Sequence, residues 1–205
     1  MKEAAGRLAF EEAQFYKGQI QALGNLRKKR FYRSRDISGV SLAATAELKR
    51  ALGLRKFPER IVCFDVSNIA GSEPVASRVS FYYEMPDKNE YRRYRIRTVV
   101  GIDDYAMIQE ALQRMLRGIK EGKEAFLPDL ILIDGGKGHL AAAFQVLKKE
   151  GFEDVALASI AKRFEHLFMR DSGDPVILPE DSKALHLVKR IRDEAHRFAI
   201  TYHRK

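Results

Sequence analysis

Cysteine is nearly absent from this sequence, and long hydrophobic runs are absent altogether. Cys63 is the single cysteine among 205 residues and lies within a short apolar segment, so disulfides and cysteine-based metal sites are excluded and a core position is expected for it. No apolar run approaches the roughly 18 residues that a membrane span requires, and no cleavable signal pattern is seen. We therefore expect a soluble, cytoplasmic chain from a reducing compartment, without membrane contact.

Positive charge is present but unevenly distributed. The formal net charge is +9, and residues 1–60 carry +8 of it, with 14 Lys and Arg against six Asp and Glu. The excess is densest at Arg27–Arg30 and continues to Lys56. Such a profile suits a polyanionic partner, and nucleic acid is the favoured interpretation. A solvated basic linker is the alternative, because it would show the same profile.

The stretch Asp129–Leu140 contains a short strand followed at once by a glycine turn. Leu130–Asp134 is an apolar run of strand length that ends in a carboxylate, and Gly135-Gly136 follows it. This order predicts a buried strand that delivers Asp134 to its C-terminal end, where sites gather in α/β sheets. The segment Gly135–Gly138 includes Lys137, but it lacks the spacing and the hydroxyl residue of a Walker A loop, so a nucleotide-binding loop is not expected.

A second predicted strand, which begins at Arg60, contains Asp65. If the two strands are parallel neighbours, Asp65 and Asp134 face each other, and two such carboxylates repel unless a cation lies between them. Carboxylate pairs of this kind are typical of Mg²⁺ or Mn²⁺ sites.

The remaining pattern predicts an α/β fold with a helical appendage. Residues 1–24 have a helical apolar face, residues 25–58 form a basic linker with a short helix at Leu42–Leu52, and the compact domain occupies residues 59–205. Its further predicted elements are strands at 75–84, 90–99 and 155–161, helices at 101–120, 140–150 and 182–202, and a hairpin of 167–170 with 176–178. This order is the layout of a ribonuclease H-like mixed sheet flanked by helices.

His196 in the closing helix is the third candidate for the site. A helix packed across the sheet could bring its imidazole to the two strand aspartates, although a lone histidine is more often a core or surface residue. With a divalent cation on Asp65 and Asp134, the three side chains would hydrolyse a phosphodiester, and His196 would complete the coordination or move a proton. Asp103 or Asp104 is placed to cap the helix that follows.

Five basic side chains are candidates for DNA contact. Arg93 and Arg95 share one face of a predicted strand with Arg97, which an exposed strand face explains equally well. Lys162 follows a predicted strand, where a solvated lysine is as good an explanation. The full candidate set is Arg93, Arg95, Lys137, Lys162 and Arg197.

Five segments together resemble the C-terminal endonuclease domain of the UvrC family of bacterial nucleotide excision repair. They are FDVSNIAG at 64–71, DDYA at 103–106, LILIDGGKGHL at 130–140, IAKRFE at 160–165 and RDEAHRFAITYHR at 192–204. The resemblance covers about residues 59–205. It implies a metal-dependent DNA endonuclease, using Mg²⁺ or Mn²⁺, that cuts on the 5′ side of a lesion, with Asp65, Asp134 and His196 as its catalytic and metal-binding residues.

The resemblance also implies an additional functional acid, at Asp103 or Asp104, and partners. Residues 1–24 resemble the UVR motif through which UvrC meets UvrB, and UvrA acts in the same pathway on damaged double-stranded DNA. Segments like the family's GIY-YIG nuclease and helix-hairpin-helix pair are not seen, so the chain is a fragment or a reduced relative. Two alternatives remain: a stand-alone structure-selective nuclease of the same fold, and an inactive module that binds DNA or UvrB.

Overall fold

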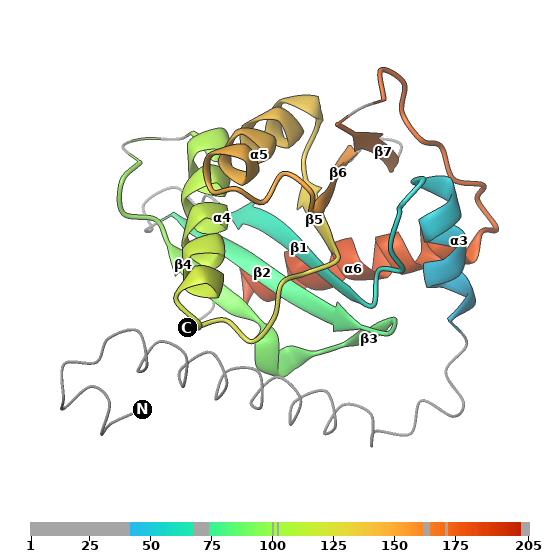
Figure 1. The fold of residues 1–205 in the computed structure, drawn as a ribbon, viewed down its shortest axis with the longest axis horizontal. Helices are drawn as coiled ribbons and strands as arrows, with labels where there is room; N and C mark the ends of the chain where they lie inside the picture. The colour runs from blue at the N-terminus through green and yellow to red at the C-terminus, as the bar shows by residue number, and fades with distance from the viewer. Residues whose placement is uncertain are drawn as a thin grey trace, which may run out of the picture.

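The computed structural model describes residues 42–67, 74–99, 101, 103–161, 165–170 and 172–201 (Figure 1). The predicted helical segment 1–24, the first part of the predicted linker and Lys162 lie outside these residues. None of the helices described is long and apolar enough to cross a membrane.

A mixed sheet forms the centre of the described fold, with the strand order β3-β2-β1-β5-β6-β7 and β4 paired with β2. The central strands β1, β5 and β6 are parallel, and the other pairings are antiparallel. The strands are β1 (Arg60–Ser67), β2 (Val75–Tyr82), β3 (Met85–Pro86), β4 (Arg92–Arg95), β5 (Leu130–Asp134), β6 (Ala156–Ala161) and β7 (His166–Met169).

Helices cover both faces of this sheet (Figure 1). They are α3 (Ala43–Ala51), α4 (Asp104–Lys120), α5 (Lys137–Lys149) and α6 (Lys183–Ile200), with a short 3-10 helix at Lys88–Glu90. Helices α6 and α3 pack together on one face, and α4 and α5 pack together on the other. The expected mixed sheet flanked by helices is therefore confirmed.

Side-chain alternation along β1 and β5 separates the two layers of the core. Ile61 and Cys63 of β1 join Leu130 and Leu132 of β5 in the layer under α6. Their sequence neighbours, including Val62 and Ile131, join the layer under α4 and α5. Because both strands are buried on both faces, their central residues are apolar at every position rather than at alternate ones, as is usual for parallel strands. Cys63 is buried, as expected.

Helices α4 and α6 each begin at a residue whose side chain caps the first turn. The Asp103 carboxylate accepts from Ala106 N at the start of α4, and the Ser182 hydroxyl accepts from Leu185 N at the start of α6. Burying a stripe of α4 residues supplies the rest of its stability. The stripe contains Met107, Ile108, Ala111, Leu112, Met115 and Leu116, and the predicted member Ile119 is only partly buried.

Four local predictions differ from the structure. The strand predicted at 90–99 is shorter, so Arg97 lies beyond it, and the preceding segment adds the two-residue strand β3. Helix α5 begins at Lys137 rather than at residue 140. The hairpin of 167–170 with 176–178 is reduced to one bridge, Leu167 with Val176, and the main partner of β7 is β6. The helix predicted at Leu42–Leu52 is present as α3, but it packs against α6 with Leu48 fully buried instead of lying in a separate linker.

Candidate active site

Asp65 and Asp134 lie side by side at the C-terminal edge of the central parallel pair. The register pairs Phe64 with Ile133, and the same offset makes Asp65 and Asp134 the next pair. Neighbouring strands are about 4.8 Å apart. Both aspartates follow the alternation of Cys63 and Leu132, which places their side chains on the α6 side of the sheet. They are buried, with 2% and 7% of their surface exposed.

His196 reaches the carboxylates from α6. Its Nδ1 lies 3.5 Å from Oδ2 of Asp65, and 61% of the imidazole side chain is exposed to solvent. The preceding residue, Ala195, is fully buried, and its carbonyl oxygen accepts from the Ser77 hydroxyl at 3.5 Å. Packing of Ala195 against the sheet therefore fixes the position of His196, while the ring itself remains accessible to a substrate.

The pKa of the Cys63 thiol is affected by the negative charges of the two aspartates. Burial raises the pKa of the Cys63 thiol well above its usual range, and the charges of Asp134 and Asp65 raise it further. The guanidinium of Arg192 acts in the opposite direction. Arg192 belongs to α6, the helix that packs on the face of the sheet where Cys63 lies.

Arg192 and Glu165 form an ion pair that the sequence analysis did not assign to the site. Arg192 Nη1 lies 2.8 Å from Glu165 Oε1, and its Nη2 donates to Asp193 Oδ1 at 3.0 Å. Burial lowers the pKa of Arg192, but these two carboxylates outweigh it, so the net shift is upward. Arg192 precedes His196 by four residues, so the two share a helix face, and this spacing was the signal available in the sequence.

The donor chemistry of the site fits a hard divalent cation. Carboxylate oxygens are suitable ligands for Mg²⁺ or Mn²⁺, whereas imidazole is a softer donor, and a cation between Asp65 and Asp134 would relieve their mutual repulsion. Within the described ranges, however, no three His, Cys, Asp or Glu side chains stand together as a preformed metal site. The structure brings the two strand carboxylates to neighbouring positions and places His196 beside Asp65.

Asp103 and Asp104, at the start of α4, have different surroundings. Asp103 Oδ1 accepts from Ala106 N at 3.0 Å, so this carboxylate caps the helix, which is the expected role of an acid at that position. Asp104 is the first residue of α4 and is exposed.

Two candidate basic side chains contact other parts of the protein. Lys137 Nζ donates to Gly173 O at 2.9 Å and lies 5.0 Å from the centre of the Phe168 ring. The Arg93 guanidinium stacks on Phe198 and donates to Phe198 O and Thr201 Oγ1, at the end of α6. Arg93 thereby ties β4 to the helix that carries His196.

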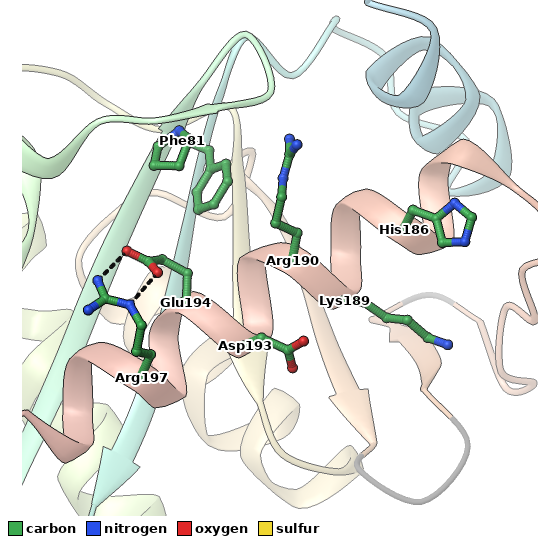
Figure 2. A pocket seen from close by; sticks show the side chains of 8 residues that line it. Phe81, His186, Lys189, Arg190, Asp193, Glu194 and Arg197 are labelled. Atoms are coloured by element: carbon green, nitrogen blue, oxygen red, sulfur yellow. Dashed lines mark hydrogen bonds and ion pairs between the residues drawn. The ribbon is translucent and has the colours of Figure 1, made fainter.

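Arg197 lies in a groove between α6 and the β2–β3 segment (Figure 2). Its Nε and Nη2 each donate to Glu194 at 2.7 Å. Figure 2 shows this pair beside Phe81, with Asp193 and Lys189 along the same helix. Arg93 and Arg197 thus both lie at the C-terminal part of α6, whereas Lys137 begins α5 and Arg95 lies exposed on β4.

A mixed sheet with paired carboxylates on its central parallel strands and a histidine on the closing helix defines a ribonuclease H-like nuclease domain. Residues 49–200 match the family model of the UvrC RNase H endonuclease domain. The chain belongs to this family.

Curated relatives support the assignment. The chain is 49% identical to UvrABC system protein C of Chlorobaculum tepidum over 162 residues, which cover 79% of this chain and 26% of the relative. It is 44% identical to the protein of the same name from Dictyoglomus thermophilum, over 79% of this chain and 27% of the relative. The chain thus spans about a quarter of the length of these relatives.

Solved structures with a similar arrangement include endonucleases. Ciona intestinalis endonuclease V, in complex with a DNA that contains inosine, aligns with a TM-score of 0.41 at 15% identity, over 73% of this chain and 65% of that one. Human endonuclease V aligns with a TM-score of 0.41 at 12% identity, over 77% of this chain and 96% of that one.

Proposed function

We propose that this chain is a metal-dependent DNA endonuclease of nucleotide excision repair, which hydrolyses a phosphodiester on the 5′ side of a lesion. The observation that carries the proposal is the placement of Asp65 and Asp134 on neighbouring parallel strands, with His196 3.5 Å from Asp65. The family and the relatives named UvrABC system protein C support the choice of pathway and substrate.

The three side chains divide the chemistry among them. Asp65 and Asp134 would hold Mg²⁺ or Mn²⁺, and such an ion, when bound, supplies Lewis-acid polarisation of the phosphoryl oxygen. Asp65 also orients the His196 ring, whose Nδ1 faces Oδ2 of Asp65. The imidazole is 61% exposed and is therefore placed to move a proton to or from the substrate.

Charged residues around the two aspartates are proposed to position the phosphodiester. Arg192 lies on α6 four residues before His196 and is oriented by its ion pairs with Glu165 and Asp193, and we propose it as a contact for a DNA phosphate. We assign the family's additional acid to Asp104, because the Asp103 carboxylate is already used in the helix cap. Arg95 and Lys162 remain candidates for contacts with the DNA backbone.

A nicking assay on a lesion-bearing duplex tests the proposal, with Mg²⁺, with Mn²⁺ and with EDTA. Asp65→Asn and Asp134→Asn should each reduce cleavage at least about a hundredfold while DNA affinity survives, because each removes a metal-binding charge and little volume. Asp154→Asn is the matched control, since Asp154 is an exposed carboxylate just before β6. Nicking that persists in both site variants, or in EDTA, would reject the proposal.

The partners proposed are damaged double-stranded DNA, UvrB through residues 1–24, and UvrA in the same pathway. The same assay, with and without UvrA and UvrB, tests this part. Removal of residues 1–24 should abolish any stimulation by UvrB and leave metal-dependent nicking of plasmid DNA unchanged. Equal stimulation of both chains would place the UvrB contact elsewhere.

A further inference from the structure

Tyr105 and His139 form a pair of rings at the starts of two helices. Tyr105 lies in the first turn of α4 and is 50% exposed, which is unusual for a large aromatic side chain. His139 lies in the first turn of α5. The ring centres are 4.6 Å apart, and the ring planes are tilted by 53°. The pair therefore presents an aromatic surface to solvent.

Two glycines of the segment after β5 make room for these rings. A Cβ on Gly135 would lie 2.5 Å from the His139 ring, and a Cβ on Gly138 would lie 2.8 Å from the Tyr105 hydroxyl. Any other residue at either position would displace a ring. This explains the glycines of Gly135–Gly138 without a nucleotide phosphate, and it indicates that the local backbone is built around the ring pair.

The rings lie at the same sheet edge as the carboxylates. Gly135 directly follows Asp134, and consecutive Cα atoms are about 3.8 Å apart, so the His139 ring is within about 8 Å of the Asp134 Cα atom. The aspartates face α6, whereas α4 and α5 cover the opposite face. A DNA strand cut at the carboxylates would therefore meet the rings where it passes over the edge of the sheet.

We propose that Tyr105 and His139 are a stacking platform for a nucleobase one or two nucleotides from the scissile phosphate. This inference rests on the proposed function, because it requires a DNA strand at Asp65 and Asp134. Aromatic side chains bind bases of any sequence through their π-faces, so the platform positions the strand without selecting its sequence. The competing explanation is that the rings only pack α4 against α5.

Fluorescence of 2-aminopurine tests the platform, because stacking quenches this base. The cut site of the full chain is first mapped on a lesion-bearing duplex, with UvrA and UvrB if they are required. 2-Aminopurine is then placed singly at each position on both sides of the cut, and binding is measured in EDTA. Quenching is expected at one or two adjacent positions for the wild type and for Tyr105→Phe.

Tyr105→Leu should abolish that quenching and weaken binding about tenfold, since one stacked base is lost. Gly138→Ala should weaken the quenching, because its Cβ displaces the Tyr105 ring while the side chain of Tyr105 is retained. Tyr83→Leu is the matched control; Tyr83 follows β2 at the opposite edge and should leave the quenching unchanged.

The outcomes separate the two proposals. Unchanged quenching in Tyr105→Leu and Gly138→Ala, with wild-type cleavage intact, overturns the platform and leaves the proposed function standing. A lower melting temperature of Tyr105→Leu with unchanged quenching would show that the rings only join the two helices. A wild-type chain that neither binds nor cuts DNA overturns both.

Discussion

The two ends of strand β1 carry buried charges in opposite arrangements. At the start of the strand, Arg60 Nη1 lies 2.6 Å from Asp87 Oδ2, and its guanidinium lies 4.5 Å from the centre of the Tyr82 ring and 4.1 Å from that of Phe126. Towards the end, Asp65 has another carboxylate as its neighbour across the parallel pair.

The eight residues of β1 therefore include one charge that is paired with an opposite charge, Arg60, and one that lies beside a like charge, Asp65. The Arg60–Asp87 pair needs no further ion, because the attraction between the two charges offsets the cost of burying them. A like pair is destabilising until a cation is added from solution. The opposite charges at the start of β1 stabilise the fold, whereas the like charges towards its end are the feature on which the proposed metal site rests.

The largest expected effect is on the opposite pair. Arg60→Met should lower the free energy of unfolding by about 3–5 kcal/mol, because Asp87, which is 3% exposed, would remain buried without its cation. Urea denaturation measures this. The double variant Arg60→Met/Asp87→Leu should recover most of the loss, and a double variant as unstable as the single one would contradict the pairing.

The next effect is stabilisation of the like pair by metal. Mg²⁺ or Mn²⁺ at about 100 times its dissociation constant should stabilise the wild type by about 2.7 kcal/mol, because the ion binds only the folded carboxylate pair. A thermal melt with and without metal measures it. The shift should disappear in Asp134→Asn and persist in Asp154→Asn; an equal shift in Asp134→Asn would place the metal elsewhere.

A third carboxylate shows how strongly a favourable environment acts on a single acid. Glu150 accepts from Lys120 and Gln113, each at 2.9 Å, and from Arg117 at 3.3 Å. The hydrogen bond from Lys120, followed by that from Gln113, lowers the pKa of Glu150 to about 2. Because the folded pKa lies below the unfolded value, the stabilisation is present above about pH 4.5 and is lost as the pH falls toward 2.

Glu150→Gln should therefore lower the free energy of unfolding by about 1 kcal/mol at pH 7, a modest value because Lys120 and Arg117 are about half exposed. The difference from the wild type should shrink as the pH falls below 4.5. Denaturation curves at pH 7 and pH 3 test this, and a difference that does not change with pH would contradict it.

The smallest effect concerns the like pair without metal. In EDTA, Asp134→Asn should be as stable as the wild type or more stable by about 1 kcal/mol, since one of two neighbouring negative charges is removed. Denaturation in EDTA measures the change. A clear loss of stability would mean that Asp134 has a structural role like that of Asp87.

The central strand and its acid were predictable because the local pattern and the tertiary context agree there. Leu130–Asp134 was expected as a strand and is one, with all five residues buried. Helix α5 starts three residues earlier than predicted, because Gly138 is a weak helix former by propensity but is required where the Tyr105 hydroxyl approaches. Tertiary packing overrode the local preference.

The tertiary contacts of Arg93 and Arg192 could not be predicted from the sequence. Alternation predicted that Arg93 and Arg95 share a strand face, and both are exposed. Nothing local shows that Arg93 would meet the end of α6, 105 residues later in the chain. The pairing of Arg192 with Glu165 depends equally on tertiary contact, because the two residues belong to different segments.

The pairing of β1 with β5 has a consequence for when cutting activity can arise. Asp65 and Asp134 are 69 positions apart, and only completion of the central parallel ladder brings them within one strand spacing of each other. A nascent, nicked or partly unfolded chain carries the same acids but no assembled centre. The proposed cleavage therefore depends on the intact β1–β5 ladder, and unfolding of that ladder alone should abolish it.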